Sequence, residues 1–137
     1  MEIKIYNYLP DEAMDIRKRV FVEEQGFCDF PDESDRSALH ILIRDGDVAI
    51  ACARLLPLNE KEYLVGRIAV LRERRGEGLG RLVVESAEAV ARERGASRLV
   101  IHAQKQAAGF YFAIGYSAFG DEDEVEGRAH LWMEKAL

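Results

Sequence analysis

The middle of the chain holds the feature that most limits its fold: an apolar stretch, a basic glycine-rich turn and an amphipathic helix follow one another directly. Residues 68–71 are apolar, residues 72–81 carry three glycines and four arginines, and apolar residues then recur with helical spacing up to Val90. Glycines let backbone amides approach a ligand closely, and a helix N-terminus adds unpaired donors and a positive dipole end. The segment therefore predicts a pyrophosphate site between a strand and a helix.

The composition is that of a globular protein. The chain has 137 residues, of which 48% are hydrophobic and 32% charged, so we expect one domain over residues 1–137. The net charge of −6 disfavours a nucleic-acid partner and is compatible with an amine-bearing substrate. No apolar run approaches the roughly 18 residues of a membrane span, and the N-terminus lacks the features of a signal peptide. We expect no membrane partner and a cytoplasmic location.

The cysteines and histidines form no recognisable metal or disulfide pattern. Cys28 and Cys52 are far apart, and His40, His102 and His130 lack the spacing of metal ligands. We therefore expect no metal site.

Periodicity and turn signals predict the element order βαβββαβαββ. The expected strands are residues 2–8, 39–44, 48–56, 61–70, 98–102, 116–119 and 127–133. Helices are expected to begin near residues 11, 79 and 107 and to end at Gly26, Gly95 and Gly115. The acidic segments 27–37 and 121–126 are expected to be irregular, solvated loops. The predicted fold class is α/β (α+β), with a mixed central sheet of six to seven strands flanked by helices and a parallel pair around the second helix.

Two common phosphate-binding motifs do not fit the glycine turn. A P-loop requires a lysine after its last glycine, and none follows here. A dinucleotide fingerprint requires Gly-x-Gly-x-x-Gly, but after Gly76 and Gly78 the chain has Arg81 in place of the third glycine. It also requires an acidic residue at the end of the next strand, where the chain has Ile101-His102.

A third motif does fit, because residues 75–80, Arg-Gly-Glu-Gly-Leu-Gly, match the acyl-CoA signature Arg/Gln-x-x-Gly-x-Gly/Ala of the GNAT N-acyltransferase superfamily. The segment Ala103-Gln104 followed by residues 107–116 resembles the family's segment after its fifth strand. Residues 19–26, Asp35 and His40 resemble the ElaA-like and YjcF-like branch, as does the C-terminal segment 127–135. The resemblance covers nearly the whole chain.

The resemblance implies an N-acetyltransferase with acetyl-CoA as its cosubstrate. The acetyl group would pass by direct attack, in a ternary complex, to the primary amine of a small-molecule or peptide acceptor that the sequence does not identify. A homodimer is plausible for the family. Two alternatives stay open: a catalytically silent domain that binds acyl-CoA as a sensor, and a generic nucleotide-binding regulator.

The resemblance also implies roles for individual residues. Tyr111 would protonate the leaving thiolate, and a backbone amide near Val70 would stabilise the oxyanion. The expected cofactor-binding residues include a strand end that pairs with pantetheine, a turn that holds the pyrophosphate, and two residues further on. They are Ile68, Ala69, Val70, Arg75, Gly76, Glu77, Gly78, Leu79, Gly80, Arg81, Gln104 and Phe110.

The general base is not determined by the sequence. His40 and Glu24 are candidates, as are His102 and His130, because histidine titrates near neutral pH and a carboxylate accepts protons. Ordered water alone serves some members of the superfamily. Cys28 is not expected to act as a nucleophile, because no base is evident beside it.

Overall fold

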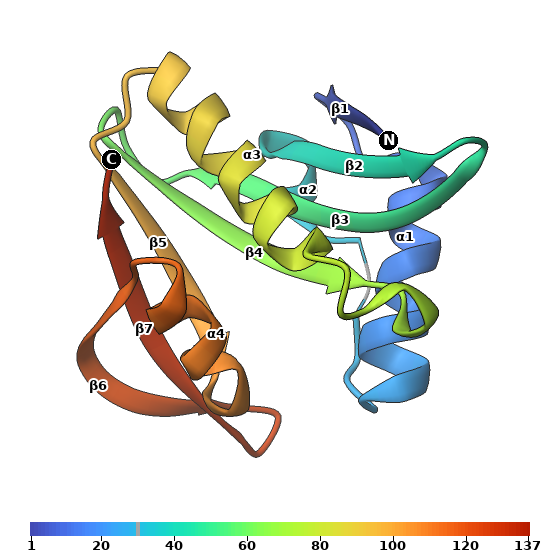
Figure 1. The fold of residues 1–137 in the computed structure, drawn as a ribbon. Helices are drawn as coiled ribbons and strands as arrows, with labels where there is room; N and C mark the ends of the chain where they lie inside the picture. The colour runs from blue at the N-terminus through green and yellow to red at the C-terminus, as the bar shows by residue number, and fades with distance from the viewer. Residues whose placement is uncertain (30) are drawn as a thin grey trace.

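The computed structural model describes residues 1–29 and 31–137, and these residues form one seven-stranded sheet flanked by helices (Figure 1). The strands are β1 (Glu2–Tyr6), β2 (Leu39–Asp45), β3 (Val48–Pro57), β4 (Glu62–Val70), β5 (Arg98–Gln104), β6 (Ser117–Val125) and β7 (Arg128–Ala136). Their order across the sheet is β1-β2-β3-β4-β5-β7-β6, and β4 and β5 pair in parallel while every other pair is antiparallel. The predicted mixed sheet and its parallel pair are confirmed.

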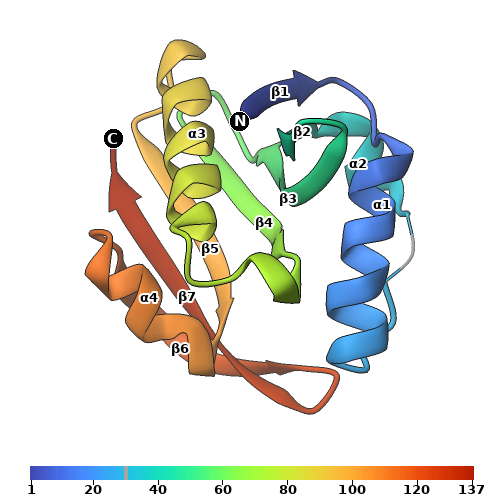
Figure 2. The ribbon, with the colours of Figure 1, turned by 45° about the vertical axis from the view of Figure 1, so that its right-hand side comes forward.

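The helices cover both faces of this sheet. They are α1 (Asp11–Arg17), which continues as the π-helical segment η1 (Lys18–Glu24), α2 (Glu33–Ser37), α3 (Leu79–Glu93) and α4 (Ala108–Ala113). Short 3₁₀ turns, Arg72–Arg74 (η2) and Lys105–Ala107 (η3), precede α3 and α4. Helices α1 and α3 lie on opposite faces of β2–β4 (Figures 1 and 2). The predicted apolar stripe of α3 is buried against the sheet, including Leu79, Val83 and Ala87.

The two parallel strands diverge at one end. Residues 62–65 of β4 pair with residues 98–101 of β5, but β4 continues to Val70 and β5 to Gln104 without further pairing between them. Figure 1 shows the strands separating as they run away from the C-terminus. Near the last pair, Arg67 has a φ of 48°, and the register with β3 shifts opposite it. A non-glycine residue with positive φ is uncommon, and such a bulge bends a strand.

The acidic segment 27–37 is not the solvated loop that the sequence predicted. It contains α2, whose start is a capping box in which Asp32 and Asp35 bond to each other's backbone amides. Asp29 and Asp35 are buried, at 7% and 3% exposure, because arginines from other elements pair with them. Phe30 lies outside the described residues.

The second acidic segment also differs from the prediction. Residues 121–124 belong to strand β6, and the turn before β7 consists of Glu126 and Gly127, with φ values of 50° and 76°. Strand β6 lies at the edge of the sheet and pairs only with β7, so its backbone is hydrogen-bonded on one side. Its charged side chains are exposed to water.

Candidate active site

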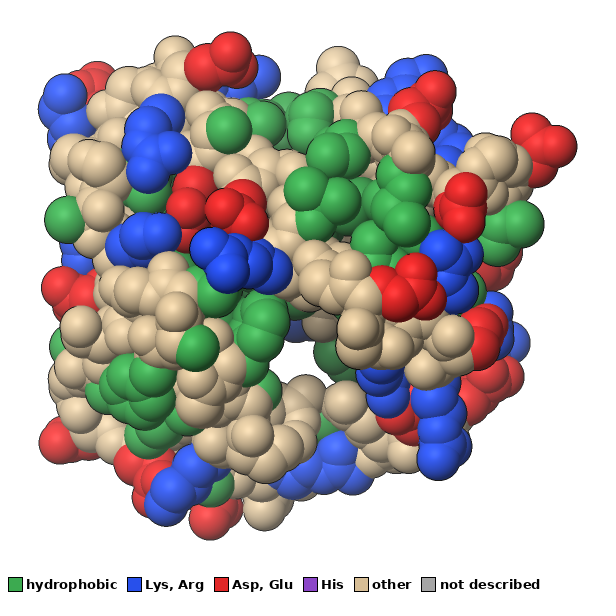
Figure 3. Space-filling model, in the orientation of Figure 1, with side chains coloured by type: hydrophobic (Ala, Val, Ile, Leu, Met, Phe, Trp, Pro, Cys, Tyr) green, Lys and Arg blue, Asp and Glu red, His purple; other side chains and the backbone are tan. Residues whose placement is uncertain are grey.

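A cavity of about 360 Å³ lies where β4 and β5 diverge. One wall comes from the segment 21–29, another from the bulge of β4, and a third from β5, β7 and the start of α4. The lining residues are Phe21, Gln25, Phe27, Cys28, Asp29, Gly66, Arg67, Ile68, Ile101, His102, Gln104, Gln106, Ala107, Tyr111, Val125, Glu126 and His130. In Figure 3 an opening passes between the two halves of the molecule at this position.

The glycine turn lies at the N-terminus of α3, next to the end of β4. Gly76 and Gly78 have φ values of 83° and 79°, a backbone conformation that residues with a Cβ rarely adopt. Gly78 caps α3 without a side-chain hydrogen bond. Within the part of the chain that the structure describes, the amides of residues 76–81 have no hydrogen-bond acceptor. These free donors can bind an anion.

Phe110 packs over this helix start. A Cβ built on Gly80 would lie 3.3 Å from Cζ of Phe110, so glycine allows the ring its close approach to α3. Phe110 itself remains 41% exposed, which leaves part of the ring open beside the turn.

The arginines of the turn are paired with carboxylates. Arg75 bonds to Glu24 at 2.6 and 2.8 Å and to the carbonyl oxygen of Val70 at 3.0 and 3.1 Å. Arg81 bonds to Glu85 at 3.1 Å. The hydrogen bonds from Arg75 lower the pKa of Glu24, which makes this carboxylate a weaker base. Glu24 does not line the cavity.

Arg74 is bound by two carboxylates of its own neighbourhood. It contacts Asp45 at 2.9 Å and Glu77 at 2.9 and 3.0 Å. The side chain of Glu77 therefore fixes the turn, while its backbone amide stays free. Leu79 is 2% exposed and belongs to the core, so of this residue too only the backbone faces the turn.

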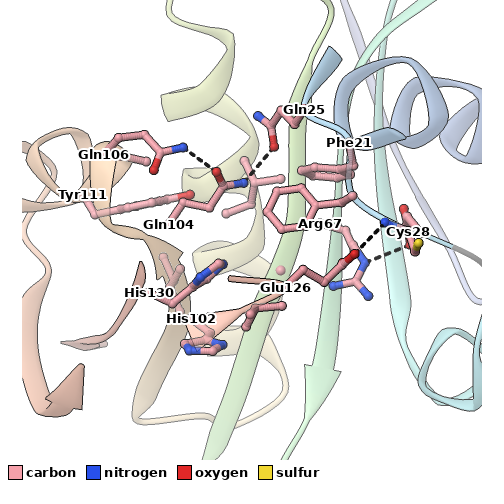
Figure 4. Close-up of a pocket in the computed structure, with 17 residues that line it drawn as sticks. Phe21, Gln25, Cys28, Arg67, His102, Gln104, Gln106, Tyr111, Glu126 and His130 are labelled. Atoms are coloured by element: carbon pink, nitrogen blue, oxygen red, sulfur yellow. Dashed lines mark hydrogen bonds and ion pairs between the residues drawn. The ribbon is translucent and has the colours of Figure 1, made fainter. Parts of the chain in front are cut away.

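Tyr111 reaches the cavity from α4, with its ring directed toward Gln104 (Figure 4). Burial raises the pKa of Tyr111 to about 12, so the hydroxyl stays protonated at physiological pH and can donate a hydrogen bond. Gln104 donates to Gln25 at 2.9 Å and thereby links β5 to the segment that follows η1.

Two of the histidines line the cavity side by side. His102 on β5 and His130 on β7 have ring centroids 4.9 Å apart. The Nε2 of His102 lies 2.7 Å from Oδ1 of Asp123, and its ring stacks on Trp132 at 4.1 Å. The Nδ1 of His130 lies 2.9 Å from the carbonyl oxygen of Arg128. The hydrogen bond from His102 lowers the pKa of Asp123.

His40 lies elsewhere. It is 1% exposed on β2, its Nε2 is 2.8 Å from the carbonyl oxygen of Asp35, and burial lowers its pKa. The structure thus brings Ile68, Gln104, Tyr111 and the two other histidines together at one cavity, and places His40 and Glu24 outside its lining.

Several cavity residues were not assigned a role from the sequence. Arg67 enters through the bulge of β4 and donates to Asp29 at 3.2 Å. Glu126 comes from the tip of the β6–β7 hairpin and accepts the amide of Cys28 at 3.1 Å. These residues come from distant segments without a shared motif. The sequence Glu126-Gly127 does not by itself predict that both residues of the hairpin turn have a positive φ. Only the glycine and the apolar residues on either side of it indicate a turn.

Neither a metal site nor a membrane-spanning helix is found among the described residues. Among residues 1–29 and 31–137, no group of three or more His, Cys, Asp or Glu side chains is arranged to hold a metal ion. No helix formed by these residues is long and apolar enough to cross a membrane.

Comparison with known proteins agrees with this geometry. The profile of the Acetyltransferase (GNAT) family matches residues 4–116. A Bacillus subtilis protein named as a candidate acetyltransferase is 38% identical over 129 residues, covering 90% of this chain and 86% of that protein. The uncharacterized N-acetyltransferase YjcF of the same organism is 31% identical over 127 residues, covering 90% of each.

Solved structures share the fold. The crystal structure of a candidate N-acetyltransferase from Lactobacillus plantarum superposes with a TM-score of 0.90 at 27% identity, covering 99% of this chain and 97% of that one. Escherichia coli ElaA superposes with a TM-score of 0.86 at 24% identity, covering 98% of each chain, which shows likeness of fold alone. The chain therefore belongs to the GNAT acetyltransferase family, with YjcF among its relatives, and is an acyl-CoA-dependent N-acyltransferase.

Proposed function

We propose that this protein transfers an acetyl group from acetyl-CoA to a primary amine by direct attack in a ternary complex. The observation that carries the proposal is the continuity of the site. The free amides of residues 76–81 lie beside the end of β4, and the diverging strands lead from there to the cavity that holds the Tyr111 hydroxyl. This succession suits a long ligand with an anionic head and a reactive end.

The residues present fit coenzyme A as that ligand. The amides of 76–81 would hold the pyrophosphate, and the positive charges of Arg75 and Arg81 would add to the attraction. Residues Ile68, Ala69 and Val70 lie on the part of β4 that has no strand on its β5 side, so the amide-containing pantetheine arm can pair there. Phe110 and Gln104 would contact that arm from the α4 and β5 sides.

The chemistry follows from these positions. Acetyl-CoA, when bound, would supply a thioester carbonyl to the residues that line the cavity. The amine nitrogen forms a bond to the carbonyl carbon, a backbone amide near Val70 stabilises the oxyanion, and the carbon–sulfur bond then breaks. Tyr111 donates its hydroxyl proton toward the departing sulfur, and the proton that the amine nitrogen loses returns through solvent to the Tyr111 oxygen, so that free CoA thiol and the acetylated amine are released.

Thiol release tests this proposal. Acetyl-CoA is incubated with a panel of amines (amino acids, lysine-containing peptides, polyamines and amino sugars), and free thiol is followed for the wild type and for Tyr111→Phe. We expect release with at least one amine, and a kcat lowered about 100-fold in the variant with an unchanged Kd for CoA. Cys28→Ser is the matched control, because direct attack does not use the cavity thiol, and it should retain activity.

Three results would contradict the proposal. CoA binding without thiol release across the panel would favour an acyl-CoA sensor. Binding of ATP or NAD in place of CoA would favour a nucleotide-binding regulator. Loss of activity in Cys28→Ser, with parallel double-reciprocal plots, would favour a covalent acetyl-cysteine over direct attack. The cytoplasmic location and a homodimer remain predictions, and sedimentation would test the second.

A further inference from the structure

We propose that Nε2 of His130 is the general base that takes the proton from the acceptor amine, and that the His102–Asp123 pair stabilises the charge formed on it. The inference rests on the proposed function and names a catalytic residue within the same site. Four observations carry it: the tautomer of His130, its access to the cavity, the neighbouring carboxylate, and the charge balance of the opposite wall.

The tautomer of neutral His130 is set by its hydrogen bond. A backbone carbonyl oxygen can only accept, so the Nδ1 that lies 2.9 Å from the Arg128 oxygen must carry the hydrogen. Nε2 then keeps its lone pair and is the nitrogen able to accept a proton. The bond to the backbone also fixes the orientation of the ring.

The lone pair is open to the cavity. His130 lines the cavity although only 6% of the residue is exposed. No side chain or backbone group of the described residues bonds to its Nε2, and none of their buried side-chain nitrogens lacks a partner. Nε2 therefore reaches open space, and Figure 4 shows the ring projecting from β7 into the cavity.

A carboxylate lies behind the two imidazoles. Asp123 on β6 bonds to Nε2 of His102 at 2.7 Å, and this bond holds the pKa of Asp123 below its ordinary value. Asp123 is therefore ionised at neutral pH. Its negative charge is separated from His130 by the ring of His102, whose centroid lies 4.9 Å from that of His130. The stacking of His102 on Trp132 keeps the pair in place.

The other charged groups around His130 carry both signs. From the opposite wall, Arg67 and Asp29 face the cavity, joined at 3.2 Å, and both belong to a network of three arginines and three aspartates (Arg17, Arg54, Arg67, Asp29, Asp32 and Asp35). At the hairpin tip, the carboxylate of Glu126 accepts the amide of Cys28 at 3.1 Å and adds a negative charge. On β7 itself, the guanidinium of Arg128 lies over the Phe27 ring, and from α4 Tyr111 is neutral.

The proton balance closes within the site. The amine nitrogen bonds to the acetyl carbon and gives one proton to Nε2 of His130. Tyr111 gives one proton to the sulfur as the carbon–sulfur bond breaks. The imidazolium returns its proton through solvent to the Tyr111 oxygen, so acetyl-CoA and amine become acetylated amine and free thiol with no net change of protons.

The first test needs no acceptor. In ¹⁵N-labelled protein saturated with CoA, long-range ¹H–¹⁵N spectra of the imidazole rings report which nitrogen carries the hydrogen in the neutral form. We expect an Nδ1–H tautomer for His130, assigned by its absence in His130→Gln. An Nε2–H tautomer would overturn the inference, because no lone pair would then face the cavity.

The second test uses the amine that the wild type acetylates best. We expect His130→Gln to lower kcat about 100-fold with unchanged CoA affinity and melting temperature, and to abolish the fall in rate at acidic pH. Imidazole in solution should restore part of the rate of His130→Ala. Asp123→Asn should lower kcat less, and Asp121→Asn, an exposed change on the same strand, should not.

The two proposals fail in different ways. If the wild type releases no thiol with any amine, the proposed function fails and this inference fails with it. If the wild type is active and His130→Gln keeps its kcat and its acidic limb, only the assignment of the base is wrong. A loss in His130→Gln that comes entirely from weaker CoA binding or unfolding also contradicts the assignment.

Discussion

Two polar regions of the molecule, an ion network and the glycine turn, differ in where their hydrogen bonds go. In the ion network, formed by Arg17, Arg54, Arg67, Asp29, Asp32 and Asp35, charged groups pair with each other. In the glycine turn of residues 76–81, the backbone amides have no acceptor among the described residues. The first region is satisfied by the protein itself, while the second has donors left for a ligand.

The difference shows how polar groups separate into structural and functional ones. Arg17 is 1% exposed, and a buried guanidinium is tolerated only with partners; its four bonds to Asp29 and Asp35 measure 2.9 to 3.3 Å. The turn lies at the surface, where water satisfies its amides until an anion replaces it. The ion network, which we call the closed region, has its partners within the protein and holds the shape of the site. The glycine turn, which we call the open region, has amides without such partners and binds the ligand.

The largest expected effect is on the closed region. Arg17→Leu leaves Asp29 and Asp35 buried without their main partner, so we expect a loss of about 3–5 kcal/mol in the free energy of unfolding, measured with urea. The control is Arg19→Leu, which breaks an exposed pair with Glu73 and should leave stability nearly unchanged. Equal effects of the two substitutions would contradict the structural role of the network.

Acid should weaken the same region. Burial alone would raise the pKa of Asp35, but hydrogen bonds, mainly from Arg17, lower it from 3.8 to about 2. Because the folded-state pKa lies below the unfolded value, the stabilisation is complete above pH 4 and is lost as pH falls from 4 to 2. We expect a loss of about 2 kcal/mol over this window, in urea titrations at pH 5 and pH 2.

Asp35→Asn provides the control for that measurement. The variant should be less stable at pH 5 and should show a smaller further loss at pH 2, because the titrating group is gone. An unchanged acid dependence in Asp35→Asn would assign the effect to other carboxylates.

A substitution in the open region should weaken the affinity for CoA. Gly78→Ala places a Cβ at a φ of 79°, which costs about 1–2 kcal/mol and shifts the adjoining amides, so we expect CoA to bind about tenfold more weakly. Gly46→Ala is the matched control, because Gly46 also has a positive φ, 62°, but lies in the β2–β3 hairpin. Calorimetric titration with CoA separates the two, and equal weakening by both would argue against a site at the turn.

The smallest effect concerns the contact of the turn with η1. Arg75 is bound to Glu24, so part of its charge is neutralised before any phosphate binds. Glu24→Gln should free that charge and tighten CoA binding about threefold at low salt. Weaker binding in the variant would mean that Glu24 positions Arg75 for the ligand instead of competing with it.

The open region was the easier of the two to predict. Gly76, Gly78 and Gly80 lie within 5 residues in the sequence, and local spacing alone indicated strand, turn and helix. The parallel pairing of β4 and β5 followed from the helix between them. These are local signals, because the residues that form the turn are neighbours in the chain.

The closed region and the base depend on long-range contacts. Asp29 and Asp35 looked like solvated carboxylates until the fold brought Arg17 to them. His40 and His102 looked alike, as single histidines in predicted apolar strands, and only the fold places His102, with His130, at the cavity and His40 away from it. Gly66 inside β4 is a sequence signal for the bulge, because a glycine within a strand often marks one, but the positive φ falls on Arg67 beside it.

One measurement tests the contrast between the two regions most directly: backbone amide spectra of the ¹⁵N-labelled protein during titration with CoA. We expect the largest shifts at the amides of residues 76–81 and along residues 66–70 of β4, with residues 32–37 nearly unchanged. Shifts concentrated in residues 32–37, with none in the glycine turn, would contradict the account.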